Sequence, residues 1–120
     1  MSTLLPEVIT SHIENNGRLV LTLHIQPELD YFAGHFPGLP LLPGVVQVDW
    51  AVRLGKDHLG LNGDFGSLDN LKFQSMIFPG ATVALMLEWQ AATGRLNFEY
   101  RQGEQVASSG RISFRSGATA

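Results

Sequence analysis

The sequence predicts an α+β domain in which an antiparallel sheet wraps around one central helix. Two observations carry this prediction. A single stretch, residues 44–59, lacks strand alternation and is apolar over most of a helical circumference. Most of the remaining chain divides into about six short segments of strand-like composition, separated by turn signals. One helix among strands joined by short turns favours a sheet that packs its apolar face against that helix.

The first two strands are predicted to form a hairpin. Residues 18–26 alternate between apolar and polar side chains, which is typical of a half-buried strand. The turn signal Asn-Asn-Gly at residues 15–17 precedes this strand, and residues 8–13 supply its partner. The side chains expected on the buried face are Leu19, Leu21, Leu23 and Ile25.

The helix is expected to begin at Gly44 and to end at Gly60. Its sides carry so many apolar residues that it should be largely enclosed, and residues 60–66 should form a glycine-rich surface loop. Four further strands follow, at residues 68–77, 82–89, 95–101 and 106–115, and residues 116–120 form a frayed tail. We expect residues 1–120 to be a single domain.

Composition excludes several functional classes. The 120 residues carry a net charge of −3, which gives no broad basic surface for nucleic acid. There is no cysteine, and the histidine spacing matches no metal-ligand set, so we expect no metal and no cofactor. The first residues lack the basic region and apolar core of a signal peptide, and no apolar run reaches membrane-spanning length. A cytoplasmic protein is expected.

The most informative segment is residues 34–44, Gly-His-Phe-Pro-Gly-Leu-Pro-Leu-Leu-Pro-Gly. Its three prolines exclude a helix and a central strand, because each fixes its own φ and restricts the residue before it. The apolar side chains argue against a solvated linker. A stiff loop that carries His35 and runs into a helix is typical of a preorganised site. The alternative interpretation is a polyproline II linker or peptide ligand.

This segment, with Val45, Val46 and Asp49 after it, resembles the signature of the 3-hydroxyacyl-acyl-carrier-protein dehydratases. These are hot-dog-fold enzymes of fatty-acid synthesis, and residues 41–50 are most similar to the dehydratase-like proteins of aryl-polyene or polyketide clusters. The resemblance implies a hot-dog fold and a 3-hydroxyacyl substrate bound to acyl carrier protein or CoA. It also implies a homodimer or an oligomer of dimers.

In this family a base removes the C2 proton, and hydrogen-bond donors stabilise the thioester oxygen. The resemblance assigns the base to His35 and the oxyanion donor to the amide of Gly44. The start of a helix suits that second role, because its amides have no internal partner and carry partial positive charge. Tyr31 and Phe36 are candidates for lining the acyl tunnel, although core packing explains them equally well.

Asp49 occupies the position of the acidic partner of His35, and the resemblance implies that the two meet across the dimer. Periodicity alone gives a different interpretation. Asp49, Arg53 and Lys56 share one sector of the helix, which is the pattern of a solvated face with an i,i+4 ion pair. Arg53 stands where relatives usually carry Gln, so we count it as a candidate for substrate binding.

The sequence therefore predicts a dehydratase that converts a 3-hydroxyacyl thioester into the trans-2-enoyl thioester. One alternative is a hot-dog thioesterase, in which Asp49 activates water and His35 is not needed. The other is a catalytically silent binding subunit of a biosynthetic complex. Carrier-protein docking would rest on a basic patch drawn from Lys72, Arg95, Arg101, Arg111 and Arg115.

Overall fold

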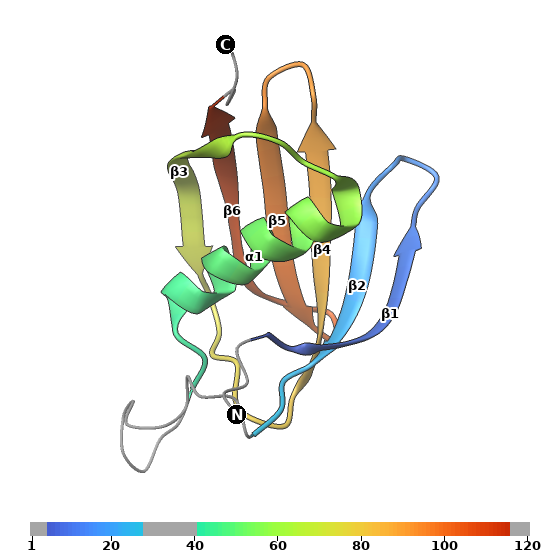
Figure 1. The fold of residues 1–120 in the computed structure, drawn as a ribbon. Coiled ribbons are helices and arrows are strands. Elements are labelled where there is room, and N and C mark those ends of the chain that lie inside the picture. Colours follow the sequence, from blue (N-terminus) through green and yellow to red (C-terminus); the bar gives the residue numbers. More distant parts are fainter. Residues whose placement is uncertain (1–4, 28–40, 116–120) are drawn as a thin grey trace.

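The computed structural model describes residues 5–27 and 41–115. The elements in chain order are β1 (Glu7–Ile13), β2 (Leu19–His24), α1 (Gly44–Leu59), β3 (Asp64–Phe73), β4 (Thr82–Gln90), β5 (Arg95–Gln102) and β6 (Gln105–Arg115). The strands form one sheet in the order β1-β2-β4-β5-β6-β3, and every neighbouring pair is antiparallel. Helix α1 crosses one face of this sheet (Figure 1). The predicted α+β arrangement is confirmed.

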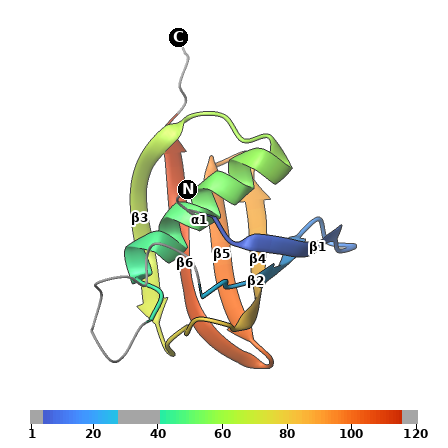
Figure 2. The ribbon, with the colours of Figure 1, turned by 60° about the horizontal axis from the view of Figure 1, so that its bottom comes forward.

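The core lies between α1 and the sheet, which curves around the helix (Figure 2). Strand alternation explains its composition, because every second side chain of a strand points to the same face. In β5 the buried residues are Leu96, Phe98 and Tyr100, and the residues between them stay partly exposed. The helix contributes Trp50, Ala51 and Leu54 to the same core.

The predicted bounds of α1 are confirmed at both ends. Gly60 ends the helix in the left-handed conformation (φ 66°), and its N–H donates to the carbonyl of Lys56 at 3.1 Å. Glycine adopts this conformation without the steric cost that a Cβ brings. The expected enclosure of the helix is wrong for one side. Val45 is 79 % exposed, because none of the described residues covers the helix face that points away from the sheet.

The third strand departs from the prediction. It spans Asp64–Phe73, so the expected surface loop at residues 60–66 is shorter and residues 74–77 lie outside the strand. Its register with β6 is broken between Phe65 and Ser67, and again between Asp69 and Lys72, where Asn70 has φ 54°. Bulges of this kind interrupt the alternation of apolar and polar side chains from which a strand is predicted in a sequence.

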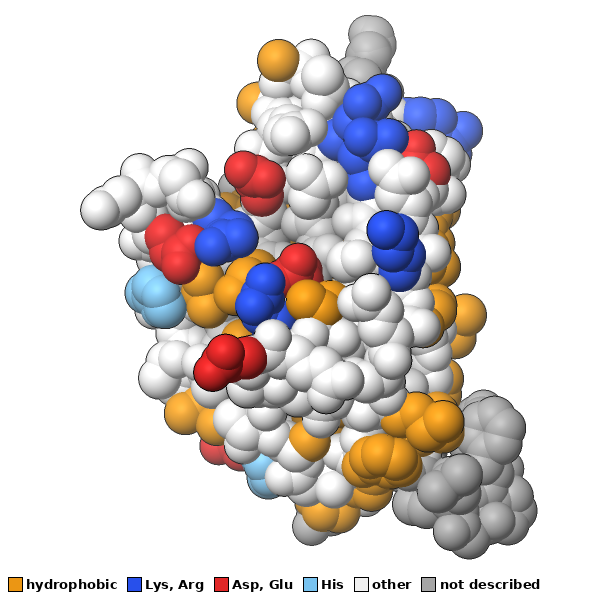
Figure 3. Space-filling model, turned by 180° about the vertical axis from the view of Figure 1, so that it is seen from behind, with side chains coloured by type: hydrophobic (Ala, Val, Ile, Leu, Met, Phe, Trp, Pro, Cys, Tyr) orange, Lys and Arg blue, Asp and Glu red, His pale blue; other side chains and the backbone are white. Residues whose placement is uncertain are grey.

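β3 is also an edge strand of the sheet, and nearly all of its residues are exposed. Apolar side chains gather along this edge and just beyond it (Figure 3), namely Phe65, Leu71, Phe73, Met76 and Phe78.

Within the described part of the chain, no helix is long and apolar enough to cross a membrane.

Candidate active site

The site is built around the start of α1. Pro43 precedes the helix in an extended conformation (φ −62°, ψ 148°) and supplies no side-chain cap. Its carbonyl accepts hydrogen bonds from the amides of Val46 at 3.1 Å and Gln47 at 3.2 Å. Among the described residues, the amides of Gly44 and Val45 have no recorded backbone partner. Amides at the positive end of a helix dipole that have no internal partner can donate to an anion or to a developing oxyanion.

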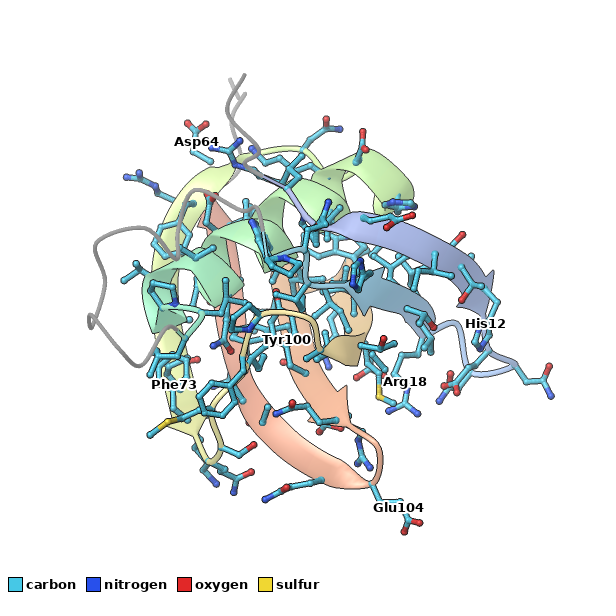
Figure 4. The ribbon with its side chains drawn as sticks, turned by 90° about the horizontal axis from the view of Figure 1, so that it is seen from below. His12, Arg18, Asp64, Phe73, Tyr100 and Glu104 are labelled. Carbon is cyan, nitrogen blue, oxygen red and sulfur yellow. The ribbon has the colours of Figure 1, made fainter. Side chains whose placement is uncertain are left out.

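Gly44 lies directly against Phe73 of β3, and Figure 4 shows Phe73 beside the first turn of the helix. A Cβ added to Gly44 would sit 2.5 Å from Cζ of the Phe73 ring, so only glycine fits while the ring stays in place. An apolar cleft of about 160 Å³ opens at this point, lined by Gly44, Val45, Val48, Leu68, Leu71 and Phe73. The amides of Gly44 and Val45 thus border a surface suited to an acyl or other apolar group.

Asp49 and Arg53 are brought together as the i,i+4 spacing predicts. Nε of Arg53 lies 2.9 Å from Oδ2 of Asp49, and the side chains are 52 % and 45 % exposed. Both residues lie on the side of α1 that points away from the sheet, which is also the side of Val45. Asp49 is five residues beyond Gly44, or ~7.5 Å along the helix axis. A group bound over this exposed face can therefore reach both.

Three of the predicted site residues, His35, Tyr31 and Phe36, lie outside the described residues. Their roles, and the pairing of His35 with Asp49, therefore stay predictions. Of the predicted site, the structure places Gly44, Asp49 and Arg53 on one helix, and it brings the last two into contact.

A set of buried polar residues beneath the helix start was not predicted. Gln47 is 3 % exposed and Ser108 is fully buried, and their side chains meet at 2.6 Å. The hydroxyl of Tyr100 donates to the carbonyl of Gln47 at 2.7 Å. Burial, together with the charge of Asp49, raises the pKa of Tyr100 well above its usual value, so the phenol stays a hydrogen-bond donor. The one sequence signal was an amide, Gln47, within a run of valines.

Comparison with known proteins identifies the relatives of the chain. A family model described as "ApeI-like: ApeI dehydratase" matches residues 11–111. A curated relative from Moorella thermoacetica, a 3-hydroxyacyl-[acyl-carrier-protein] dehydratase FabZ, is 32 % identical over 112 residues. That alignment covers 85 % of this chain and 78 % of the relative.

Two solved structures are similar throughout. A chain of the dehydratase heterocomplex ApeI:P from Xenorhabdus doucetiae is 36 % identical with a TM-score of 0.84, and the match covers 92 % of this chain and 98 % of that one. An uncharacterized protein from Erwinia carotovora subsp. atroseptica is 38 % identical with a TM-score of 0.83, covering 92 % and 96 %. The hot-dog fold expected from the resemblance is therefore confirmed.

Proposed function

The chain belongs to the ApeI-like dehydratase family, and from this premise we propose that it removes water from a 3-hydroxyacyl thioester carried by an acyl carrier protein. The product is the trans-2-enoyl thioester. The observation that carries the proposal is the helix start, where the amide of the motif glycine, which has no backbone partner among the described residues, lies next to an apolar cleft. A carrier-protein substrate would place the reaction in the cytoplasm.

We assign the chemical steps as follows. His35 takes the proton from C2, and the electron pair of that C–H bond forms the double bond between C2 and C3 as the C3–O bond breaks. Asp49 orients the departing hydroxyl, which takes the proton now held by the His35 imidazolium and leaves as water, so that His35 returns to its neutral form. The amides of Gly44 and Val45 hold the thioester oxygen while negative charge develops on it.

The test is mass spectrometry of a panel of 3-hydroxyacyl-carrier-protein substrates after incubation with the protein. Loss of one water from the acyl group, with the thioester intact, is the expected result. Release of free carrier thiol would instead indicate a thioesterase. No change in any substrate, together with tight binding of another protein, would indicate a silent subunit and overturn the proposal.

We propose that the protein acts as a homodimer joined along the β3 side. Val45, Phe73 and Met76 are 79 %, 50 % and 54 % exposed around the helix start and the free edge of β3. An unpaired edge flanked by apolar side chains is a surface that a second sheet covers well. One similar structure is a dehydratase heterocomplex, ApeI:P, which is in keeping with a second subunit beside this fold, although there the two partners differ.

Phe73→Asp should weaken this dimer at least ~10-fold, because it places a charge in the centre of the apolar surface. Light scattering at micromolar concentration is expected to give the dimer mass for the unmodified protein and a lower mass for the variant. Ile9→Asp is the matched control, since Ile9 is 51 % exposed on the opposite edge strand, β1. A monomer mass for the unmodified protein would contradict the proposal.

Carrier-protein docking is the second partner proposal. Two of the predicted cations are already paired, Arg111 with Asp69 at 3.0 Å and Arg101 with Glu99. For Lys72, Arg95 and Arg115 no ion pair is recorded with any described residue. Figure 3 shows cationic and anionic side chains scattered over the outer face of the sheet. We therefore propose a small local contact rather than long-range attraction, in keeping with the net charge of −3.

Lys72→Glu should raise KM for the carrier-bound substrate about 3-fold to 10-fold and leave kcat unchanged, because it alters encounter and not chemistry. Lys56→Glu makes the same charge change on the exposed side of α1 and serves as the control. An unchanged KM in Lys72→Glu would remove Lys72 from the docking surface.

Arg53→Gln tests whether the ion pair on the exposed helix face belongs to the site. The loss of stability should stay below ~1 kcal/mol, since both partners are about half exposed. We expect the relative kcat/KM values across hydroxyacyl chain lengths to change, because the variant carries the residue usual in the family. Identical chain preference and an identical pH–rate profile would place Arg53 outside the site.

A further inference from the structure

Three buried hydrogen-bonding side chains meet beneath the first turn of α1, and dehydration chemistry has no direct use for any of them. They are Gln47 of the helix, Tyr100 of β5 and Ser108 of β6, and all are at most 3 % exposed. Core positions of this kind are usually apolar, because a polar group that loses water and finds no partner destabilises the fold. Here each group has found a partner.

The partners lie on the backbone that frames the helix start. Nε2 of Gln47 donates to the carbonyl of Leu42 at 3.1 Å, just before the Pro43–Gly44 entry. The hydroxyl of Tyr100 donates to the carbonyl of Gln47 at 2.7 Å, just after the amides of Gly44 and Val45. These bonds fix the chain on both sides of Gly44 and Val45.

Two more bonds complete the frame. The amide of Leu42 donates to the carbonyl of Ile77 at 2.8 Å, so the entry is also fixed to the segment that follows β3. Ser108 donates to Oε1 of Gln47 at 2.6 Å and thereby sets the orientation of the amide group. Because the Leu42 carbonyl can only accept, the NH₂ group of Gln47 must point toward it.

We propose that Gln47, Ser108 and Tyr100 are positioning residues that hold the amides of Gly44 and Val45 in place to bind the thioester oxygen. The inference rests on the proposed dehydration. Donors of this kind stabilise an oxyanion only when they are fixed in advance, and a misplacement of about 1 Å costs ~10² in rate. A network that spans the helix start from beneath meets that requirement without touching the substrate.

Two conservative variants test the network. Tyr100→Phe removes one hydroxyl, and the Gln47 carbonyl keeps its helical hydrogen bond. Ser108→Ala removes the donor that orients the Gln47 amide. Gln47 itself is a poorer test, because its loss would leave the Leu42 carbonyl and the Ser108 hydroxyl buried without partners. Ile112→Val is the control, since it removes one buried methyl group elsewhere on β6 and no hydrogen bond.

We expect both variants to lower kcat and kcat/KM together by about 10-fold, with KM unchanged, because the affected interaction forms mainly in the transition state. Ile112→Val should keep the kcat of the unmodified protein, even if its melting temperature falls as much as that of the two network variants. A merely structural network would lower stability in all three proteins and leave kcat unchanged, and that result would overturn the inference.

A second readout needs no turnover. Hydrogen exchange of the Leu42 amide, followed by NMR, reports opening of the helix entry, because this amide is bonded to Ile77. Exchange should accelerate several-fold in Tyr100→Phe and Ser108→Ala but not in Ile112→Val. Unchanged exchange in both variants would refute the positioning role. If exchange responds while no hydroxyacyl substrate is dehydrated, the network holds the entry and the proposed reaction is what fails.

Discussion

His35→Ala is expected to lower the dehydration rate by ~10² or more while the protein stays folded. His35 is the proposed general base, and an imidazole titrates near neutrality, which suits the removal of a proton from C2. It lies in a segment whose path is restricted by three prolines, so its side chain should contribute chemistry more than packing. We therefore expect a large fall in kcat with only a small shift in melting temperature.

The measurement is the initial rate of enoyl thioester formation, together with a thermal melt of each variant. His58→Ala is the matched control, because His58 is an exposed histidine in the last turn of α1. If His35→Ala keeps most of the activity, His35 is a structural residue and the dehydratase mechanism proposed above fails.

Mixing two inactive variants tests whether the site is shared between subunits. In a symmetric dimer where His35 of one subunit meets Asp49 of the other, a mixed dimer of His35→Ala and Asp49→Ala contains one intact site. With random exchange, half of the dimers are mixed, so about a quarter of the unmodified activity should return. No recovery after complete subunit exchange would place both residues of a site in the same subunit.

The helix and most strands could be predicted because their signals are local. Pro43 and Gly44 mark the start of α1 and Gly60 marks its end, and the burial of β5 follows a two-residue alternation. The start of β3 could not be predicted from the sequence. Two bulges break the alternation of apolar and polar residues there, and the side chains of an edge strand need not be apolar. The predicted dehydratase class is confirmed by the family match over residues 11–111.

The candidate site also has a part that the sequence predicts and a part that it does not. Gly44, Asp49 and Arg53 lie within ten residues of one another, so helical geometry alone relates them. Tyr100 and Ser108 contact Gln47 across 53 and 61 positions of sequence. No periodicity connects such distant residues, since their proximity depends on how β5 and β6 pair beneath the helix. A single sequence therefore predicts the motif but not the network that supports it.

Gly44→Pro is expected to lower kcat by ~10² relative to Gly44→Ala. Proline removes the amide hydrogen of residue 44, and losing one oxyanion donor typically costs 10²–10³ in rate. The helix should survive, because proline is well tolerated at the first helical position and Pro43 already has the extended ψ of 148° that a following proline requires.

Gly44→Ala is the control that isolates the effect of losing the amide hydrogen. Both substitutions add a Cβ that would approach the Phe73 ring at 2.5 Å, so both must displace that half-exposed ring by a similar amount. Only proline also removes the N–H. Circular dichroism and light scattering verify that the two variants keep the same helix content and the same mass before their rates are compared. Equal kcat values would mean that the Gly44 amide does not bind the reacting oxygen, and the Val45 amide would then be the donor to test.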